Sequence, residues 1–438
     1  QQKGVPMTIS SSLNAGISGL SANASALASI SDNIANSGTY GYKRVQTDFN
    51  SMVMASAGGA YSAGGVRSGT TRMIDERGSL VATTNATDLA IGGRGMLPVA
   101  NLTEVTGGAA DPTMYMTTTG SFNVNQDGYL VTGSGLVLLG WPANTDGTMP
   151  DYPRDTAAGL EPIQYDTNRL QASATTSIEL GINLPAESTE AGSAGNVESS
   201  LIEFFDGIGK SKNLQVNFAP TVPATGESNE WTLTIEDTDN PGTNIGEYVM
   251  TFDPADGSLQ SVTNGATGGA YDGTSGTAIV NTFAGDPIEI TIGTVGDATY
   301  MSQLSGDYSP VGINKDGSAA GTIKAVEVDT NGFVHANYSS GETRIIYQIP
   351  VADMRNPNGM TALDQQTFKP SSESGSYFLW NAGDGPAGEI NSYALEESAT
   401  DVAGELTNMI KTQRAYSSNA KVIQTVDEML QETTNIKR

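Results

Sequence analysis

The sequence contains no cysteine and a single histidine, His335. Without cysteine there is no disulfide framework and no thiolate nucleophile or metal ligand. One histidine also excludes His–His metal sites and catalytic triads that need a second orienting histidine. His335 follows a predicted hairpin turn at polar spacing, so we expect it at a solvated strand position. The sequence therefore predicts no catalytic residue, no metal site and no cofactor.

Basic residues are scarce, with 21 lysines and arginines against 48 aspartates and glutamates, and the formal net charge is −27. Such a charge argues against nucleic acid and against anionic membranes as partners. The imbalance is greatest between Gly181 and Pro310, where Lys210 and Lys212 are the basic residues. A nearly neutral N-terminal end beside an acidic middle predicts packed termini and a solvated outer body.

Long apolar runs are missing as well. One of the longest, Leu136–Leu139, falls far short of the roughly 20 residues that a membrane-spanning helix needs. Polar residues and glycine interrupt the segment from Ser10 to Ser18, so the apolar core of an ordinary cleaved signal peptide is absent there. We therefore expect no membrane insertion, and export, if it occurs, without a cleaved signal of the ordinary kind.

Two stripes of apolar residues stand out at the ends of the chain. Alternating steps of four and three predict helices that pack lengthwise, one over about Ser11–Ala35 and one to about Asn435. Ser398 and Asp401 have the spacing of a capping box for the second helix. The first seam consists of Leu13, Ile17, Leu20, Ala24, Leu27, Ser31 and Ile34, and the second of Val402, Leu406, Met409, Tyr416, Ala420, Ile423 and Leu430.

The sequence between the helices has the pattern of β-structure. Alternating residues flank the turns Asn125–Gly128 and Asn331-Gly332, which predicts two hairpins. We predict a mainly β fold with a coiled-coil-like pair of terminal helices and two nested β domains. The predicted domains are a helical core (7–40 and 397–438), an irregular Gly-rich connector (41–80), a discontinuous inner β domain (81–159 and 311–396) and an inserted acidic outer β domain (160–310).

The terminal helices carry more apolar residues than one pair can cover. Ile30, Ile410 and Val422 lie off the two seams and still need partners. Packing of several copies would supply them, and this is the interpretation we favour. A closed two-helix stalk within a monomer is the alternative.

Near its start the chain reads Ser18-Gly19-Leu20, then Asp32-Asn33-Ile34-Ala35-Asn36, and after a short turn Gly41-Tyr42-Lys43. This run resembles the N-terminal signature of bacterial flagellar rod and hook proteins. The family reads SGL, then NNIAN, a short turn, GF or GY, and K. The match runs from Ser18 to Arg44, with Asp32 in place of the first asparagine. The signature positions present here are Asn33, Ile34, Ala35, Asn36, Gly41, Tyr42 and Lys43.

The end of the chain resembles the C-terminal signature of the same family through Gln413, Arg414 and Tyr416. Internal matches, including Thr87–Ile91 and Gly140–Pro142, favour the hook members, whereas rod members usually lack a large inserted domain. The acidic insert lies outside the resemblance. A distal rod protein is one alternative, and a secreted β-rich glycan-binding protein is an alternative from another class.

The resemblance implies a structural subunit of a curved, flexible, extracellular tube that joins the flagellar motor to the filament and transmits torque. The seam residues would be its assembly surface. Its partners would be further copies of itself, the distal rod protein, the hook cap, the hook–filament junction proteins and the type III export apparatus.

Several motifs are weak site candidates. Gly209-Lys210-Ser211 lacks the earlier glycine of a phosphate-binding loop, because Phe204 stands there. Asn123, Asn125 and Asp127 match the opening of a calcium loop, but Ser134 replaces its bidentate glutamate, so a hairpin turn is the better explanation. The pair Lys43-Arg44 is too small for nucleic acid, and we expect it at a contact between subunits.

Overall fold

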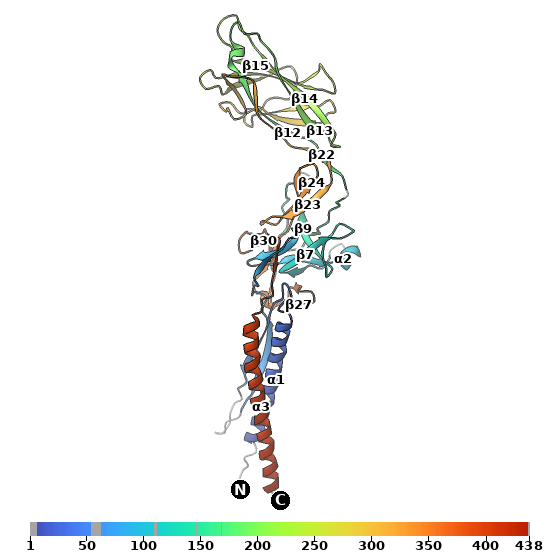
Figure 1. The fold of residues 1–438 in the computed structure, drawn as a ribbon, viewed down its shortest axis with the longest axis vertical. Helices are drawn as coiled ribbons and strands as arrows, with labels where there is room; N and C mark the ends of the chain where they lie inside the picture. Colours follow the sequence, from blue (N-terminus) through green and yellow to red (C-terminus); the bar gives the residue numbers. More distant parts are fainter. Residues whose placement is uncertain (1–6, 54–62, 109–111, 145–146, 168, 437–438) are drawn as a thin grey trace. The chain divides into compact units, whose positions relative to one another are not determined.

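The computed structural model describes residues 7–53, 63–108, 112–144, 147–167 and 169–436. The chain divides into two compact units. Unit 1 comprises residues 1–166, 326–336 and 344–438, and unit 2 comprises residues 167–325 and 337–343. The fold is mainly β with a helix near each end, as the sequence predicts (Figure 1).

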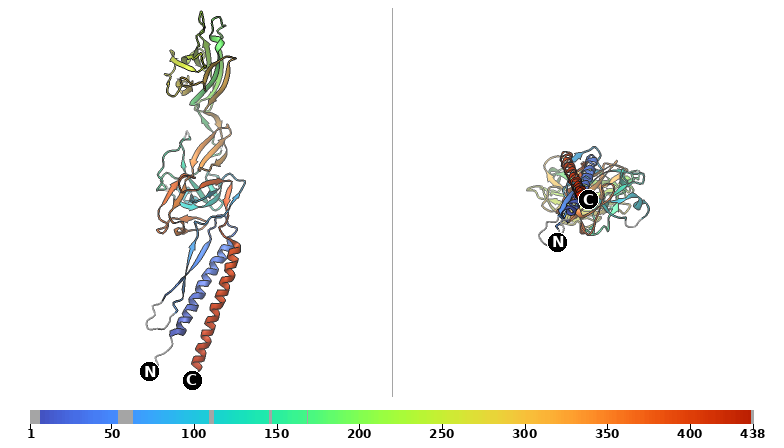
Figure 2. Two further views of the ribbon diagram at one scale, coloured as in Figure 1. Left: turned by 90° about the vertical axis from the view of Figure 1, so that its left-hand side faces the viewer. Right: turned by 90° about the horizontal axis from the view of Figure 1, so that it is seen from below.

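The two terminal helices belong to unit 1. Helix α1 (Met7–Ala35) and helix α3 (Val402–Ile436) lie side by side (Figures 1 and 2). Asp401 caps α3, because its Oδ1 accepts the N–H of Ala403 at 3.1 Å. The prediction that Ser398 begins the helix as the first residue of a capping box is therefore wrong.

Residues 41–80 are not an irregular connector. Strands β1 (Val45–Ser51) and β2 (Val66–Arg72) pair antiparallel from Val45↔Arg72 to Ser51↔Val66. The pair runs alongside α1 (Figure 2). Polar and small residues dominate both strands, and most of their side chains are exposed or half-buried, so the alternation that marks a strand in sequence is weak here.

Unit 1 also contains a long antiparallel sheet. Its main order is β27-β28-β6-β5-β9-β8-β7-β4-β30. The turns at Asn125–Gly128 and Asn331-Gly332 are hairpin turns, as predicted. The strands are β4 (Asp88–Gly92), β5 (Leu97–Asn101), β6 (Tyr115–Thr117), β7 (Thr119–Val124), β8 (Leu130–Thr132), β9 (Leu136–Pro142), β27 (Thr361–Ala362), β28 (Phe368–Lys369) and β30 (Glu389–Ser392).

Shorter elements complete this part of the chain. Strand β10 (Glu161–Pro162) pairs with β9, and a meander of β23 (Ile323–Val328), β24 (Phe333–Tyr338) and β25 (Thr343–Gln348) joins β9 through β25. The remaining elements are β3 (Leu80–Ala82) with β31 (Ala394–Glu396), β26 (Val351–Met354) with β29 (Tyr377–Trp380), helix α2 (Leu102–Thr106) and a 3-10 turn (Pro357–Gly359).

The core of unit 1 is rich in methionine. Met96, Met116 and Met354 pack with Trp141 and Phe368 in one buried cluster. The ring of Trp141 stacks on Tyr152, with centroids 5.8 Å apart. Methionine side chains are unbranched and flexible, so they can fill the irregular gaps between short strands.

Unit 2 consists of two five-stranded sheets that share one core, including Trp231, Phe218 and Ile290. The antiparallel sheet contains β13 (Glu198–Phe205), β14 (Ser211–Pro220), β15 (Glu230–Asp237), β16 (Asn244–Phe252) and β17 (Leu259–Asn264). The other contains β12 (Ser177–Pro185), β18 (Thr277–Asn281), β19 (Pro287–Thr291), β20 (Met301–Leu304) and β21 (Ser309–Lys315). Strand β11 (Gln171–Ser173) pairs with β22 (Ser318–Gly321), and a 3-10 turn covers Ala186–Thr189.

Candidate assembly site and its junction

The structure buries the predicted seam residues of the terminal helices only in part, although one of them, Ile423, contacts α1 at Gly16. On α1, Ile17 is 51% exposed. Half-buried positions are Leu13, Leu20, Leu27 and Ile34 on α1 and Met409 and Ile423 on α3, while Val402, Leu406, Tyr416 and Leu430 are exposed. The periodicity therefore identifies apolar stripes that this chain itself covers only in part.

On the α1 side, small residues form the contact with α3. A β-carbon on Gly16 would lie 3.1 Å from Cγ1 of Ile423, and one on Gly19 would lie 2.9 Å from Nδ2 of Asn419. These two glycines let α3 approach α1 closely. Further along α1, Ala22, Ala26 and Ile30 are buried.

Exposed apolar side chains remain on α3. Leu406 is 48% exposed and Ile410 is 54% exposed. Val422 and Met429 are also exposed. Full burial of a large aliphatic side chain is worth roughly 1.5–3 kcal/mol, so covering this surface would be a considerable driving force for association.

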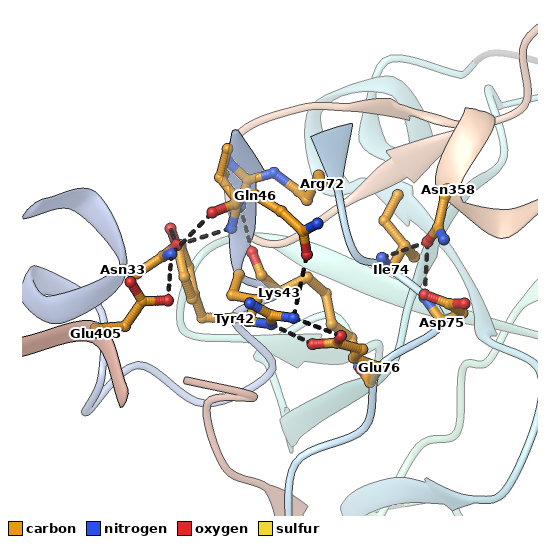
Figure 3. Close-up of polar contacts among 12 residues, drawn as sticks. Asn33, Tyr42, Lys43, Gln46, Arg72, Ile74, Asp75, Glu76, Asn358 and Glu405 are labelled. Carbon is orange, nitrogen blue, oxygen red and sulfur yellow. Dashed lines mark hydrogen bonds and ion pairs between the residues drawn. The ribbon is translucent and has the colours of Figure 1, made fainter. Parts of the chain in front are cut away.

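Asn33 is the centre of a polar junction between α1, β1 and α3 (Figure 3). It is 1% exposed. Its Nδ2 donates to the carbonyl oxygen of Val45 and to Oε1 of Glu405, both at 2.9 Å. Its Oδ1 accepts the N–H of Val45 at 2.8 Å and the hydroxyl of Tyr42 at 3.1 Å. An asparagine that uses both donor hydrogens and both lone pairs fixes three elements at one point.

Tyr42 links this junction to Asp32, the residue that departs from the family pattern. The single hydrogen of the Tyr42 hydroxyl is shared between Oδ1 of Asn33 and Oδ2 of Asp32, which lies 2.9 Å away. The guanidinium of Arg72 lies 5.3 Å from the ring centroid. Burial, followed by the hydrogen bond and charge of Asp32, raises the pKa of Tyr42 to about 12. The aspartate therefore has a specific partner within the chain.

Lys43 is buried inside unit 1, which contradicts the expectation of a contact between subunits. It is 1% exposed, and its Nζ donates to Oε1 of Glu396 and to the carbonyl oxygen of Glu76, both at 2.7 Å. Burial lowers the pKa of Lys43 to about 8, and the Glu396 carboxylate opposes this shift. The neighbouring Arg44 forms an ion pair with Glu76, and both side chains are half-exposed.

Glu396 ties the C-terminal part of unit 1 to the residues after α1. Besides Lys43, its Oε1 accepts the N–H of Gly78 at 2.8 Å. Its Oε2 lies 3.7 Å from Nη1 of Arg77, and burial lowers the pKa of Arg77. Its backbone carbonyl accepts the N–H of Gly41, which has a left-handed φ of 70°.

Sequence reasoning missed Glu396, Glu405, Glu76 and Arg77. The one sequence feature that could have indicated a buried carboxylate is Glu396, which directly follows the apolar residues Ala394 and Leu395. The other signature residues lie at the edges of the junction or outside it. Ile34 is half-buried, Ala35 is exposed at the end of α1, Asn36 donates to the carbonyl oxygen of Asp32, and Gln413 and Arg414 are exposed on α3.

The weak candidates for phosphate and calcium sites lie in hairpin turns. Gly209 and Lys210 lie in the β13–β14 hairpin, where Oδ1 of Asp206 accepts the N–H of Lys210 at 2.9 Å. Oδ1 of Asn125 accepts the N–H groups of Asp127 and Tyr129 in the β7–β8 turn. Within the part of the chain that the structure describes, no group of three or more His, Asp or Glu side chains could hold a metal ion.

His335 lies on β24, half-buried rather than fully solvated, with Nε2 3.2 Å from Oδ2 of Asp329. Replacing His335 with alanine is expected to change the free energy of unfolding by less than about 1 kcal/mol, because partly exposed pairs contribute little. Thermal unfolding of the two proteins measures this difference. A loss of several kcal/mol, or of any function of the protein, would show that His335 has a role beyond this pair.

Two family models match the ends of the chain. Residues 13–43 match the model described as flagella basal body rod protein, and residues 391–436 match the flagellar basal body rod FlgEFG protein C-terminal model. The N-terminal match includes most of α1 and extends to Lys43, and the C-terminal match includes α3 and Glu396. These models define a class of structural proteins of the bacterial flagellum.

Relatives over the whole chain specify the family. The flagellar hook protein FlgE of Brucella suis is 35% identical over 99% of this chain and 100% of its own length. FlgE of Rhizobium meliloti is 31% identical over the same shares. The chain belongs to the flagellar hook protein family. A crystal structure of Helicobacter pylori flagellar hook protein FlgE2 aligns with a TM-score of 0.48 at 14% identity, covering 72% of this chain and 100% of that one.

Neither long helix has the apolar length to cross a bilayer, and no other described helix does.

Proposed function

We propose that this chain is the subunit of the flagellar hook and that it polymerises through its terminal helices into a curved, flexible tube. The observation that carries this proposal is the set of large apolar side chains, including Leu406 and Ile410, that stay exposed on α3 although α1 lies beside it. In the tube, helices of neighbouring copies would pack lengthwise in a coiled-coil-like arrangement and cover these side chains.

The tube would transmit torque from the motor to the filament as a universal joint. A bent rotating tube must lengthen and shorten on each side once per turn, so its inner contacts must hold while its outer contacts slide. Apolar helix packing suits the first requirement. Unit 2, which we assign as the acidic outer domain predicted for residues 160–310, suits the second because like charges weaken contacts between copies.

We infer the partners and location from the same family. The partners would be the distal rod protein, the hook cap and the hook–filament junction proteins. The type III export apparatus would deliver the chain to the extracellular flagellum without cleavage of a signal peptide.

Negative-stain electron microscopy of the purified chain tests the proposal. Curved tubes are the expected result. Straight rods would favour a distal rod protein. Absence of polymer, together with binding to glycans, would favour a secreted glycan-binding protein instead.

A deletion tests the role of unit 2. Replacing residues 167–322 with a short Gly/Ser linker, which keeps β23 whole, is expected to preserve polymerisation, because α1 and α3 belong to unit 1. The polymers should be straighter than those of the whole chain, since the sliding outer contacts are gone. Electron microscopy measures both properties. If the deletion abolishes polymers while circular dichroism shows a folded remainder, unit 2 is an assembly element and this division of roles is wrong.

A further inference from the structure

One face of α3 is turned away from α1. Asn419 and Ile423 mark the side that contacts α1 at Gly19 and Gly16. An α-helix turns by about 100° per residue. Four charged residues lie on the opposite side of the helix, rotated by about 180–220° around its axis from Asn419. These residues, which we call the outer charged stripe, are Arg414, Lys421, Glu428 and Glu432.

The outer charged stripe is ordered by sign along the helix. Arg414 and Lys421 come first, and Glu428 and Glu432 follow. All four side chains are exposed. None of them belongs to an ion pair within the described ranges of the chain. The stripe is therefore available to another molecule.

Stability of α3 itself does not explain this order. The helix macrodipole acts within the first and last turns of a helix, so it gives no reason for basic residues to precede acidic ones across the interior of α3. Glu428 and Glu432 are also four residues apart, where like charges destabilise a helix. The charge order costs the isolated helix some stability, so it points to a partner outside the chain.

We propose that the outer charged stripe binds the same stripe of a second, parallel copy that is shifted along the helix axis. A shift of 14 residues places Arg414 opposite Glu428, and a shift of 11 residues places Lys421 opposite Glu432. At 1.5 Å per residue these shifts correspond to about 17–21 Å, and the long side chains span the difference. The proposal rests on the proposed function, because subunits of a tube share one direction.

The stripe would set the register rather than the strength of association. Exposed ion pairs are individually weak, so the apolar side chains must supply most of the affinity. A parallel pair with no shift places arginine against arginine and glutamate against glutamate, and this repulsion disfavours that register. An antiparallel pair would also match the charges, but it would close into a dimer and could not grow.

Charge reversal of the full-length chain tests the proposal. The acidic variant, Arg414→Glu with Lys421→Glu, is expected to raise the critical concentration for polymerisation at least tenfold at low ionic strength. The basic variant, Glu428→Lys with Glu432→Lys, should do the same. Lys210→Glu with Lys324→Glu in unit 2 is the matched control, since it changes the net charge as the acidic variant does and should polymerise normally. Sedimentation measures the polymer, and circular dichroism checks that helix content is unchanged.

Two restorations decide the result. The fourfold variant, which exchanges the signs along the stripe, should polymerise as the unmodified chain does. An equal mixture of the acidic and basic variants should also polymerise, at a total concentration where neither variant polymerises alone. Normal polymers from the acidic variant, failure of both restorations, or discrete dimers of the unmodified chain would overturn the shifted pairing. If the unmodified chain forms no polymer of any kind, the proposed function itself fails, which this first measurement reveals separately.

Discussion

Replacing Leu406 and Ile410 with aspartate is expected to abolish polymerisation without unfolding the chain. Both side chains are about half exposed in the single chain, so the substitutions leave no buried charge in unit 1. In a polymer that covers this face, each aspartate would have to be buried without a partner, which costs several kcal/mol. Electron microscopy and sedimentation should show monomers at concentrations where the unmodified chain is fully assembled.

A chemically matched control is available in unit 2. Leu201 and Ile208 are also exposed, and their replacement by aspartate makes the same two changes of side chain. This control should still polymerise, because we assign no strong assembly contact to unit 2. If the control fails to assemble and the α3 variant assembles normally, the assembly surface lies in unit 2 and the terminal helices have another role.

Replacing Lys43 with methionine is expected to lower the free energy of unfolding of unit 1 by about 3–5 kcal/mol, because it leaves the buried carboxylate of Glu396 without its main partner. A second change, Glu396→Gln, should recover part of this loss by removing the unpaired charge. Since burial lowers the pKa of Lys43, the charged pair fixes geometry more than it adds stability. Denaturant unfolding followed by tyrosine and tryptophan fluorescence measures the changes.

Arg44 gives the control for this experiment. Its ion pair with Glu76 is half-exposed on both sides, so Arg44→Met should cost less than about 1 kcal/mol. Equal effects of Lys43→Met and Arg44→Met would mean that burial of the charge does not determine the strength of the junction.

The sequence predicts best those elements whose cause is local. The turn at Asn125–Gly128 is stabilised by the Asn125 side chain, which accepts hydrogen bonds from backbone N–H groups of the same turn. The residues of the turn therefore suffice to predict the hairpin. The β1–β2 pair was missed because most of its side chains stay exposed or half-buried, and a strand without a buried face has no clear period.

For the terminal helices, the periodicity predicts which apolar residues share one face of the helix, but it does not predict which part of the protein covers that face. Within this chain α1 and α3 meet at Gly16 and Gly19, and small residues give no hydrophobic signal. The junction is hidden for another reason. Lys43 and Asn33 are polar residues that can be buried because they pair with Glu396 and Glu405. The sequence near Lys43 and Asn33 does not indicate which distant residues these partners are.

The junction also has a consequence for the order in which the protein folds. Lys43 bonds to a residue 353 positions later, and Asn33 bonds to one 372 positions later. Closing a loop of that length lowers the chain entropy before the contacts it brings together contribute any stabilising free energy, so such contacts form late. Unit 2 can fold from residues nearer in the sequence, whereas α1 gains its anchor only when the segment from Glu396 to Glu405 arrives. The last tenth of the polypeptide therefore completes the first, and a chain that has not finished emerging cannot yet hold its helices in place.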